Sequence, residues 1–366
     1  MANKLNQIVR VNTVKATSSV LTTSVNTVAI VVTGSAKAAG EYSDLDSVVE
    51  DFAKTTEAYK MAQTFFSQKT HPDKLVIITA ASASSSDVID AVESASGFDF
   101  FHVVLSYAFS GVDAAAKAAA AVAFVKALDT KANEVFKMFH LEVNIDGNAS
   151  LLSTIFSGEG GLTESGTERV SIWAHDTTTY ENEHLAVAIV AQRCGVDPAR
   201  GTWAHKKGLV GITPDNLTAS EVAAAKSAGY NIYTTIAGVA RTFMGTTCGP
   251  TAFIDTIVKC DWIKFNTESE IYRLLGDANE GYGLTYDDTG IQAIGAIISK
   301  VLTQAADSTH QYIMEGYTVT VPTYASIAQA QKDKRNVPNI KGNYSVMDSV
   351  HTVLDVTLNI VYPEAE

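Results

Sequence analysis

The chain has few cysteines and few charged side chains for its length. Three cysteines, Cys194, Cys248 and Cys260, are scattered through 366 residues, so they favour reduced thiols in a cytoplasmic setting over a disulfide framework. Charged residues make up 18% of the sequence, and the formal net charge is −13. A protein that binds nucleic acid through its phosphates has a basic surface, so we expect no nucleic-acid partner.

Long apolar runs are absent as well. No stretch reaches the roughly 20 apolar residues that a membrane-spanning helix needs, so we expect no direct membrane insertion. The first residues contain an early lysine but no apolar core followed by a cleavage site, so we expect no signal peptide. Hydrophobic residues make up 46% of the chain, and its length favours two well-packed domains.

Catalytic signatures are also missing. There is no glycine-rich loop ending in Lys-Ser or Lys-Thr, and no Gly-x-Ser-x-Gly elbow. Gly158, Gly160 and Gly161 do not have the spacing of a dinucleotide site. Residues 82–86 are mostly serine and lie between an expected strand and helix, where anions can bind, but a helix cap is the commoner use of such a loop. We therefore predict no catalytic residue, no cofactor and no metal.

The densest group of histidines and carboxylates is His175, Asp176, Glu183 and His184. Its spacing matches no standard zinc motif. A loop between a strand and a helix often carries such residues for capping, and we favour this interpretation over a metal or catalytic role.

The two ends of the chain are what stands out. In residues 350–362 (VHTVLDVTLNIVY) apolar and polar side chains largely alternate, which is the pattern of a two-faced strand. Residues 8–14 (IVRVNTV) are rich in β-branched residues. Exposed strand edges pair readily with other chains, so we predict that both ends are arms that pair with neighbouring copies. The predicted interface residues are Ile8, Arg10, Val11, Lys15, Val350, Leu354, Asp355, Val356, Leu358 and Ile360.

The charges of the two ends are opposite. The first forty residues contain Lys and Arg at positions 4, 10, 15 and 37 and no acidic residue, which gives +4. Residues 343–366 contain Asp348, Asp355, Glu364 and Glu366 and no Lys or Arg, which gives −4. Opposite charges set register and partner choice more than affinity. The alternative is that both termini fold back on their own domain, which is also common.

Between the arms, short apolar runs alternate with helical patterns, which predicts an α/β fold. We expect an N-terminal arm over 1–27, an α/β middle domain over 28–200, a C-terminal core domain over 201–345 and a C-terminal arm over 346–366. Residues 253–276 are expected to contain helical segments, and residues 326–335 to form a polar helix. That helix would carry Lys332 and Arg335 on one face.

Four segments, taken in order, resemble the contractile tail sheath proteins of myophages. They are residues 59–80 (YKMAQTFFSQKTHPDKLVIITA), 207–238 (KGLVGITPDNLTASEVAAAKSAGYNIYTTIAG), 253–275 (FIDTIVKCDWIKFNTESEIYRLL) and 335–362 (RNVPNIKGNYSVMDSVHTVLDVTLNIVY). The third segment is followed by the Asp-Thr-Gly-Ile opening of another helix. The resemblance covers residues 52–362.

The resemblance implies a structural subunit of the virion, assembled in the host cytoplasm into a helical tube of six-fold rings. Its partners would be further copies, the inner tail tube, and baseplate and neck proteins. Arms would link neighbouring copies while the bodies move, and contraction would drive the tube through the host envelope. We expect Lys332 and Arg335 to touch the tail tube. The alternatives are the sheath of a related contractile injection system or tailocin, and an α/β enzyme with an unrecognised site.

Overall fold

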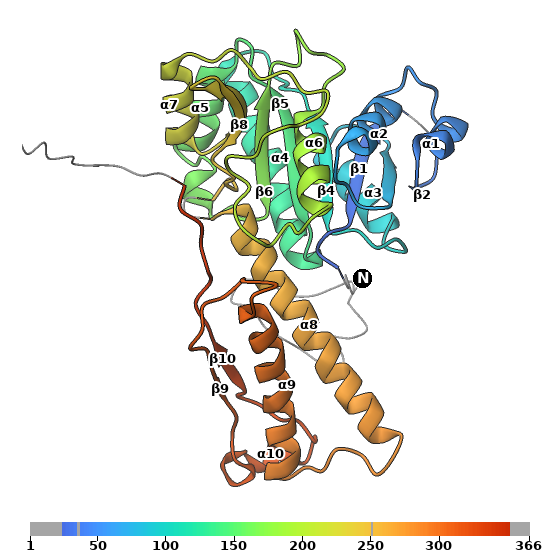
Figure 1. Cartoon of the computed structure of the whole chain (residues 1–366), viewed down its shortest axis with the longest axis vertical. Coiled ribbons are helices and arrows are strands. Elements are labelled where there is room, and N and C mark those ends of the chain that lie inside the picture. Colours follow the sequence, from blue (N-terminus) through green and yellow to red (C-terminus); the bar gives the residue numbers. More distant parts are fainter. Residues whose placement is uncertain (1–23, 35–36, 250–251, 352–366) are drawn as a thin grey trace, which may run out of the picture.

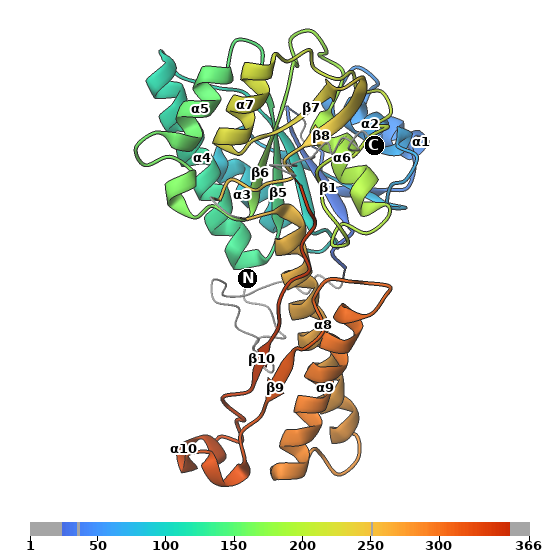
Figure 2. The ribbon, with the colours of Figure 1, turned by 60° about the vertical axis from the view of Figure 1, so that its left-hand side comes forward.

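The computed structural model describes residues 24–34, 37–249 and 252–351. We call the described part of residues 24–249 the body. The stalk, residues 252–343, projects from one edge of the body (Figure 1). Residues 344–351 return along the stalk towards the body, and we call them the C-terminal root (Figure 2).

The body is built on one mixed sheet with the strand order β2-β3-β1-β4-β5-β6-β7-β8. The strands from β3 to β7 in that order run parallel, whereas β2 and β8 are antiparallel to their neighbours. The strands are β1 (Val28–Thr33), β2 (Gly40–Tyr42), β3 (Leu75–Ala80), β4 (His102–Tyr107), β5 (Met138–Asn144), β6 (Val170–His175), β7 (Asn231–Ile236) and β8 (Val239–Phe243).

Helices cover both faces of this sheet. On one face α2 and α6 pack against the strands, and α1 packs against α2 and the edge strand β2; on the other face α3, α4, α5 and α7 form a layer. The helices are α1 (Leu45–Asp51), α2 (Glu57–Ser67), α3 (Ser85–Ser94), α4 (Ala114–Val135), α5 (Ala149–Ser157), α6 (Leu185–Cys194) and α7 (Ala219–Ala228), with a short 3₁₀ helix η2 (Thr163–Ser165). The α/β prediction is confirmed.

The double cover explains why the central strands are continuous apolar runs. In β1, Val28, Ile30 and Val32 face one core cluster. Ala29 and Val31 face the other. Successive side chains point to opposite faces of a strand, so a strand buried on both sides cannot show a polar–apolar alternation.

The predicted division at residue 200 falls after α6. Beyond it, β7 pairs with β6 and β8 pairs with β7, so both strands extend the same sheet. The chain leaves the sheet only when α8 (Ile254–Asn279) begins. The helical segments expected over 253–276 belong to this one helix of 26 residues, roughly 39 Å long at 1.5 Å per residue.

The stalk consists of α8, α9 and a small sheet. Its further elements are α9 (Asp288–Ala306), β9 (Thr318–Thr320), η3 (Tyr324–Ser326), α10 (Gln329–Lys332) and β10 (Lys341–Asn343). Strands β9 and β10 are antiparallel and lie beside α9. The polar helix expected over 326–335 is wrong in extent, because α10 has 4 residues and Arg335 has a φ of 55°, which ends a right-handed helix.

A buried ion pair fixes α8 to the body. The guanidinium of Arg169, just before β6, donates to both carboxylate oxygens of Asp261 in α8, one at 2.7 Å. Its Nε also donates to Asn133 of α4 at 3.1 Å. Phe265, one turn further along α8, contacts Phe101 and Phe136 at the amino ends of β4 and β5. The stalk is therefore attached to the body at the amino edge of the sheet, where the amino ends of the parallel strands lie.

Candidate functional site

Of the predicted interface residues, only Val350 lies among the described residues. Its side chain is 78% exposed. Ile8, Arg10, Val11 and Lys15 fall outside the described residues, as do Leu354, Asp355, Val356, Leu358 and Ile360. Pairing by the arms therefore stays a prediction. The structure does show how the described residues next to each predicted arm are attached to the rest of the chain.

The C-terminal root is held first by backbone bonds to the segment after α9. The N–H of Met314 donates to the carbonyl of Ser345 at 2.8 Å, and the N–H of Met347 donates to the carbonyl of Tyr312 at 2.9 Å. Between them Ile313 and Val346 form an antiparallel bridge. The root therefore begins as a short ribbon against a buried part of the stalk.

A buried lysine makes the second attachment. Lys259 of α8 is fully buried, and its ammonium donates to Asp255 at 2.5 Å and to the carbonyl of Met347 at 2.8 Å. A buried ammonium is tolerated only when it is paired and hydrogen-bonded. The Lys259 charge, compensated by Asp255 one helical turn away, thus holds the backbone of the root.

His351 makes the third attachment, at the last described residue. Its Nε2 lies 2.6 Å from the hydroxyl of Thr202, and its carbonyl accepts a hydrogen bond from Nε2 of His205 at 2.9 Å. Its ring meets the ring of Phe253 edge-on, with the centroids 4.6 Å apart. Burial lowers the pKa of His351, and the nearby Asp255 only partly opposes this. The chain is thus fixed to the body up to the residue where the predicted arm begins.

The N-terminal end is also fixed at its start. Val25 is buried, and the carbonyl of Thr27 accepts hydrogen bonds from the N–H groups of Phe101 and His102, both at 3.0 Å. These contacts lie at the amino edge of the sheet, close to the residues that attach the stalk to the body. Sequence spacing gave no signal for Thr202, His205 or Lys259 as attachment points, because their partners are 88 to 149 residues away.

Lys332 and Arg335 lie near the far end of the stalk, away from the body (Figure 1). The ammonium of Lys332 sits 4.3 Å from the centroid of the Tyr324 ring, a cation–π contact. Arg335 is exposed and follows α10, so the two side chains do not share one helix face as predicted. Their contact with a tail tube stays a proposal.

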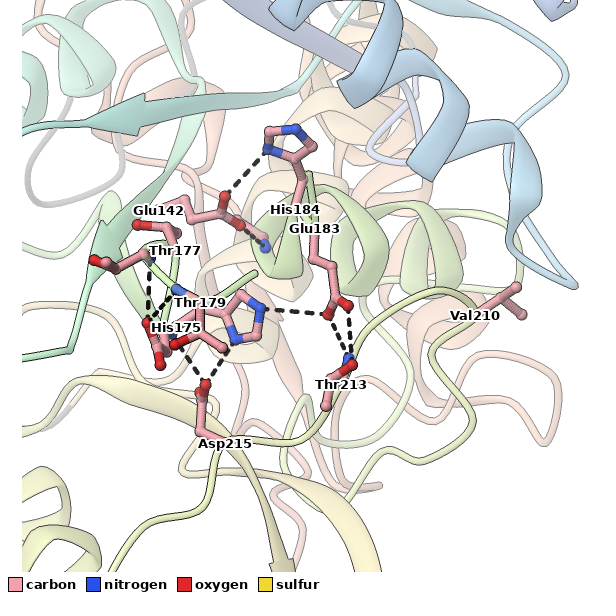
Figure 3. A network of polar contacts seen from close by, with 12 residues as sticks. Glu142, His175, Thr177, Thr179, Glu183, His184, Val210, Thr213 and Asp215 are labelled. Carbon is pink, nitrogen blue, oxygen red and sulfur yellow. Dashed lines mark hydrogen bonds and ion pairs between the residues drawn. The ribbon is translucent and has the colours of Figure 1, made fainter. Parts of the chain in front are cut away.

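The histidine and carboxylate cluster forms a network at the carboxyl edge of the sheet (Figure 3). His175 lies between Asp215 and Glu183. His184 lies 3.2 Å from Glu142, whose other oxygen accepts the N–H of Ala186 at 2.8 Å. Asp176 instead caps its own turn through the N–H groups of Thr178 and Thr179. Sequence reasoning missed Glu142 and Asp215, because the sheet brings them in from other segments.

Among the described residues, no group of three or more histidine, cysteine, aspartate or glutamate side chains has the geometry to hold a metal ion. Within the same part of the chain, no helix is both long and apolar enough to span a bilayer.

Among the comparisons with known proteins, the one with solved structures found chains of similar fold. No family model and no curated protein matches it. It superposes on a chain of the anti-feeding prophage helical sheath in its contracted state, with a TM-score of 0.59 at 10% identity over 96% of this chain and 97% of the other. A chain of the anti-feeding prophage baseplate in its contracted state gives a TM-score of 0.57 at 11% identity over 96% and 98%. The chain therefore has the fold of these contractile sheath and baseplate chains.

Proposed function

We propose that this chain is the repeating subunit of a contractile sheath. Identical copies assemble into a helical tube around an inner tail tube, and contraction of the sheath drives that tube through a host cell envelope. The observation that carries the proposal is the shared fold with a helical sheath chain over 96% of this sequence. Head-to-tail contacts that do not close in a plane generate such an open helix.

The arms are the links between copies. The C-terminal arm starts from a root held at Tyr312, Met314, Lys259 and Thr202, so tension on it is passed to both the stalk and the body. Strands β9 and β10 supply an acceptor for arms of neighbouring copies. A two-stranded sheet is marginal by itself, and further strands added at its edges stabilise it. Side chains of both strands are largely exposed.

The proposed partners follow from this assembly. They are further copies arranged in six-fold rings, a tail tube, and baseplate and neck proteins. Lys332, Arg335 and neighbouring residues at the tip of the stalk contact the tube. The protein assembles in the host cytoplasm and becomes part of a virion. It is not an enzyme, and the energy of contraction comes from the packing of the lattice.

A second candidate is the sheath of a phage-like injection system. The observation that favours it is that both similar structures come from the anti-feeding prophage. The two candidates share the subunit, the tube and the arms, and they differ in whether the particle also carries a genome. Particles purified with their contents distinguish them, since a phage tail is attached to a head that contains DNA.

Electron microscopy of the purified chain tests the proposal. The full-length protein should form tubes, whereas a chain that ends at His351 should stay folded and unassembled, because it keeps the root and lacks the arm. A chain that ends at Tyr362 is the matched control, because it keeps the alternating segment, and it should still form tubes. Compact particles from the full-length chain, or normal tubes from the chain ending at His351, would contradict the proposal.

A further inference from the structure

His175, the last residue of β6, is completely buried between two carboxylates. Its Nδ1 lies 3.0 Å from Oδ1 of Asp215, and its Nε2 lies 3.6 Å from Oε2 of Glu183 (Figure 3). Asp215 comes from the segment between α6 and α7, and Glu183 from the loop that precedes α6. The imidazole therefore sits where three segments meet at the carboxyl edge of the sheet.

Both carboxylates also accept hydrogen bonds from other donors. Asp215 accepts the N–H of Asp176 at 3.0 Å. Glu183 accepts both the N–H and the hydroxyl of Thr213, the hydroxyl at 2.9 Å. Neither ring nitrogen of His175 makes a hydrogen bond of good geometry with these carboxylates, so the contacts depend on charge. A neutral imidazole carries no net charge, whereas an imidazolium is attracted to both carboxylates.

We propose that His175 is a proton-operated latch. In its protonated form it ties residues 213–215 and Glu183 to the end of β6, and loss of the proton releases these segments from the sheet. The latch belongs to the single folded chain, so it does not depend on the proposed sheath function.

Several acidic side chains surround His175. Glu142 of β5 and Asp176 add negative charge. The ring of Tyr180 stacks on the imidazole with the centroids 5.5 Å apart and shields one face from water. Burial opposes protonation, but Asp215 together with the charges of Glu142 and Glu183 outweighs it, so the pKa of His175 is raised above its ordinary value of 6.5.

The direction of the pH effect follows from that shift. The folded state binds the proton more tightly than the unfolded state, so the stabilisation is complete below about pH 6.5 and is lost as pH rises through the folded pKa. His184 has a raised pKa for a similar reason, because burial is outweighed by Glu142 and Glu57. The segments at the carboxyl edge of the sheet should therefore loosen as pH rises.

A second pair of buried histidines behaves in the opposite way. His102 and His140 share a hydrogen bond of 2.8 Å in the core, and the charged side chain that acts on His102 is the guanidinium of Arg193 rather than a carboxylate. Burial lowers the pKa of His102 to about 3 and that of His140 well below 6.5. These two stay neutral and destabilise the fold only on the acid side. Burial alone therefore does not make a histidine a latch here, and the paired carboxylates do.

The test combines histidine NMR titration with urea unfolding of dilute full-length protein between pH 5 and 9. His175 should titrate above 6.5. One linked proton lowers the folding equilibrium constant by up to tenfold per pH unit over the window between the two pKa values. His175→Gln should remove that part of the pH dependence, and Asp215→Asn should move the His175 midpoint downward.

His310→Gln is the matched control for the histidine-to-glutamine exchange, because His310 is half-buried beside a single carboxylate, Asp307, and lies on the stalk, outside the carboxyl edge of the sheet. If His175→Gln does not fold, the midpoint shift in Asp215→Asn decides the question. A His175 midpoint at or below 6.5 would overturn the proposal, and so would a His175→Gln variant with the wild-type slope.

Discussion

Replacing Asp261 with alanine should loosen α8 from the body. The change leaves the Arg169 guanidinium buried, with the amide oxygen of Asn133, the ring of Phe136 and the more distant charge of Asp129 as its remaining partners. Arg169 is 6% exposed and Asp261 is 1% exposed, so water does not replace the lost carboxylate without rearrangement.

The size of the effect follows from this burial. Removing one partner of a buried ion pair costs about 3–5 kcal/mol of unfolding free energy, because the other charge stays buried. The charge of Asp129 partly compensates the unpaired guanidinium, so we expect the unfolding free energy to fall by about 3 kcal/mol, at the low end of that range. Replacing both partners with apolar residues of similar volume, Arg169→Met with Asp261→Leu, should recover most of the loss, since such exchanges are often close to neutral.

Urea unfolding of dilute, unassembled protein followed by circular dichroism measures both quantities. The backbone N–H of residue 169 still donates to Asp129 in the double variant, so the start of β6 keeps its own bond. A loss below about 1 kcal/mol in Asp261→Ala would refute the reasoning, because it would place the pair with exposed salt bridges. A double variant as unstable as the single one would also refute it.

Three further predictions concern the two ends of the chain and the tip of the stalk. Reversing Arg10 and Lys15 to Glu should weaken assembly by about 0.2–1 kcal/mol for each cross-strand pair, and high salt should restore it; equal sedimentation at all salt concentrations would show that arm charge is incidental. Replacing Lys332 and Arg335 with Ala should spare tubes of sheath alone but impair growth on tail tubes, which microscopy can count; unchanged growth would remove these residues from the contact. His351→Ala should lower the unfolding free energy by about 1 kcal/mol and speed proteolysis after the root, since one side-chain hydrogen bond is lost; unchanged proteolysis would argue against the attachment.

The strands of the body could be predicted from sequence because they are buried on both faces. Runs such as residues 75–80 are apolar throughout, and they form β3 as expected. Strand β2 was missed, since Gly40–Tyr42 is short, lies at an edge and has one buried residue. The continuation of the sheet through β7 and β8 beyond residue 200 depends on long-range pairing, which no local pattern records.

Helix α8 shows where a local pattern misleads. Its base carries Asp255, Lys259, Asp261, Lys264 and Glu268, all buried, and these charges interrupt the apolar periodicity. Two pairs within this set satisfy each other one turn apart, and Asp261 finds Arg169 in the body. Because the last pairing is tertiary, the sequence predicted helical segments over 253–276 but not the extent of the one continuous helix that the structure has.

The candidate sites divide in the same way. Clustering in sequence was enough to single out His175 and Glu183, which are eight positions apart and close in space. Asp215 lies 40 positions beyond His175 and reaches it only because the segment after α6 crosses the carboxyl edge of the sheet. The alternation of residues 350–362 predicted an arm, but the attachment of His351 to Thr202 could not be read from spacing.

The measurement that tests the sheath account most directly is calorimetry of assembled particles, with microscopy of the same sample before and after heating. An extended sheath should pass irreversibly to a shorter and wider form, with heat released and no nucleotide added, since the energy is held in the packing of the lattice. The copies should remain linked throughout, because the arms stay paired. A requirement for ATP, or a contracted form that extends again on cooling, would contradict the account.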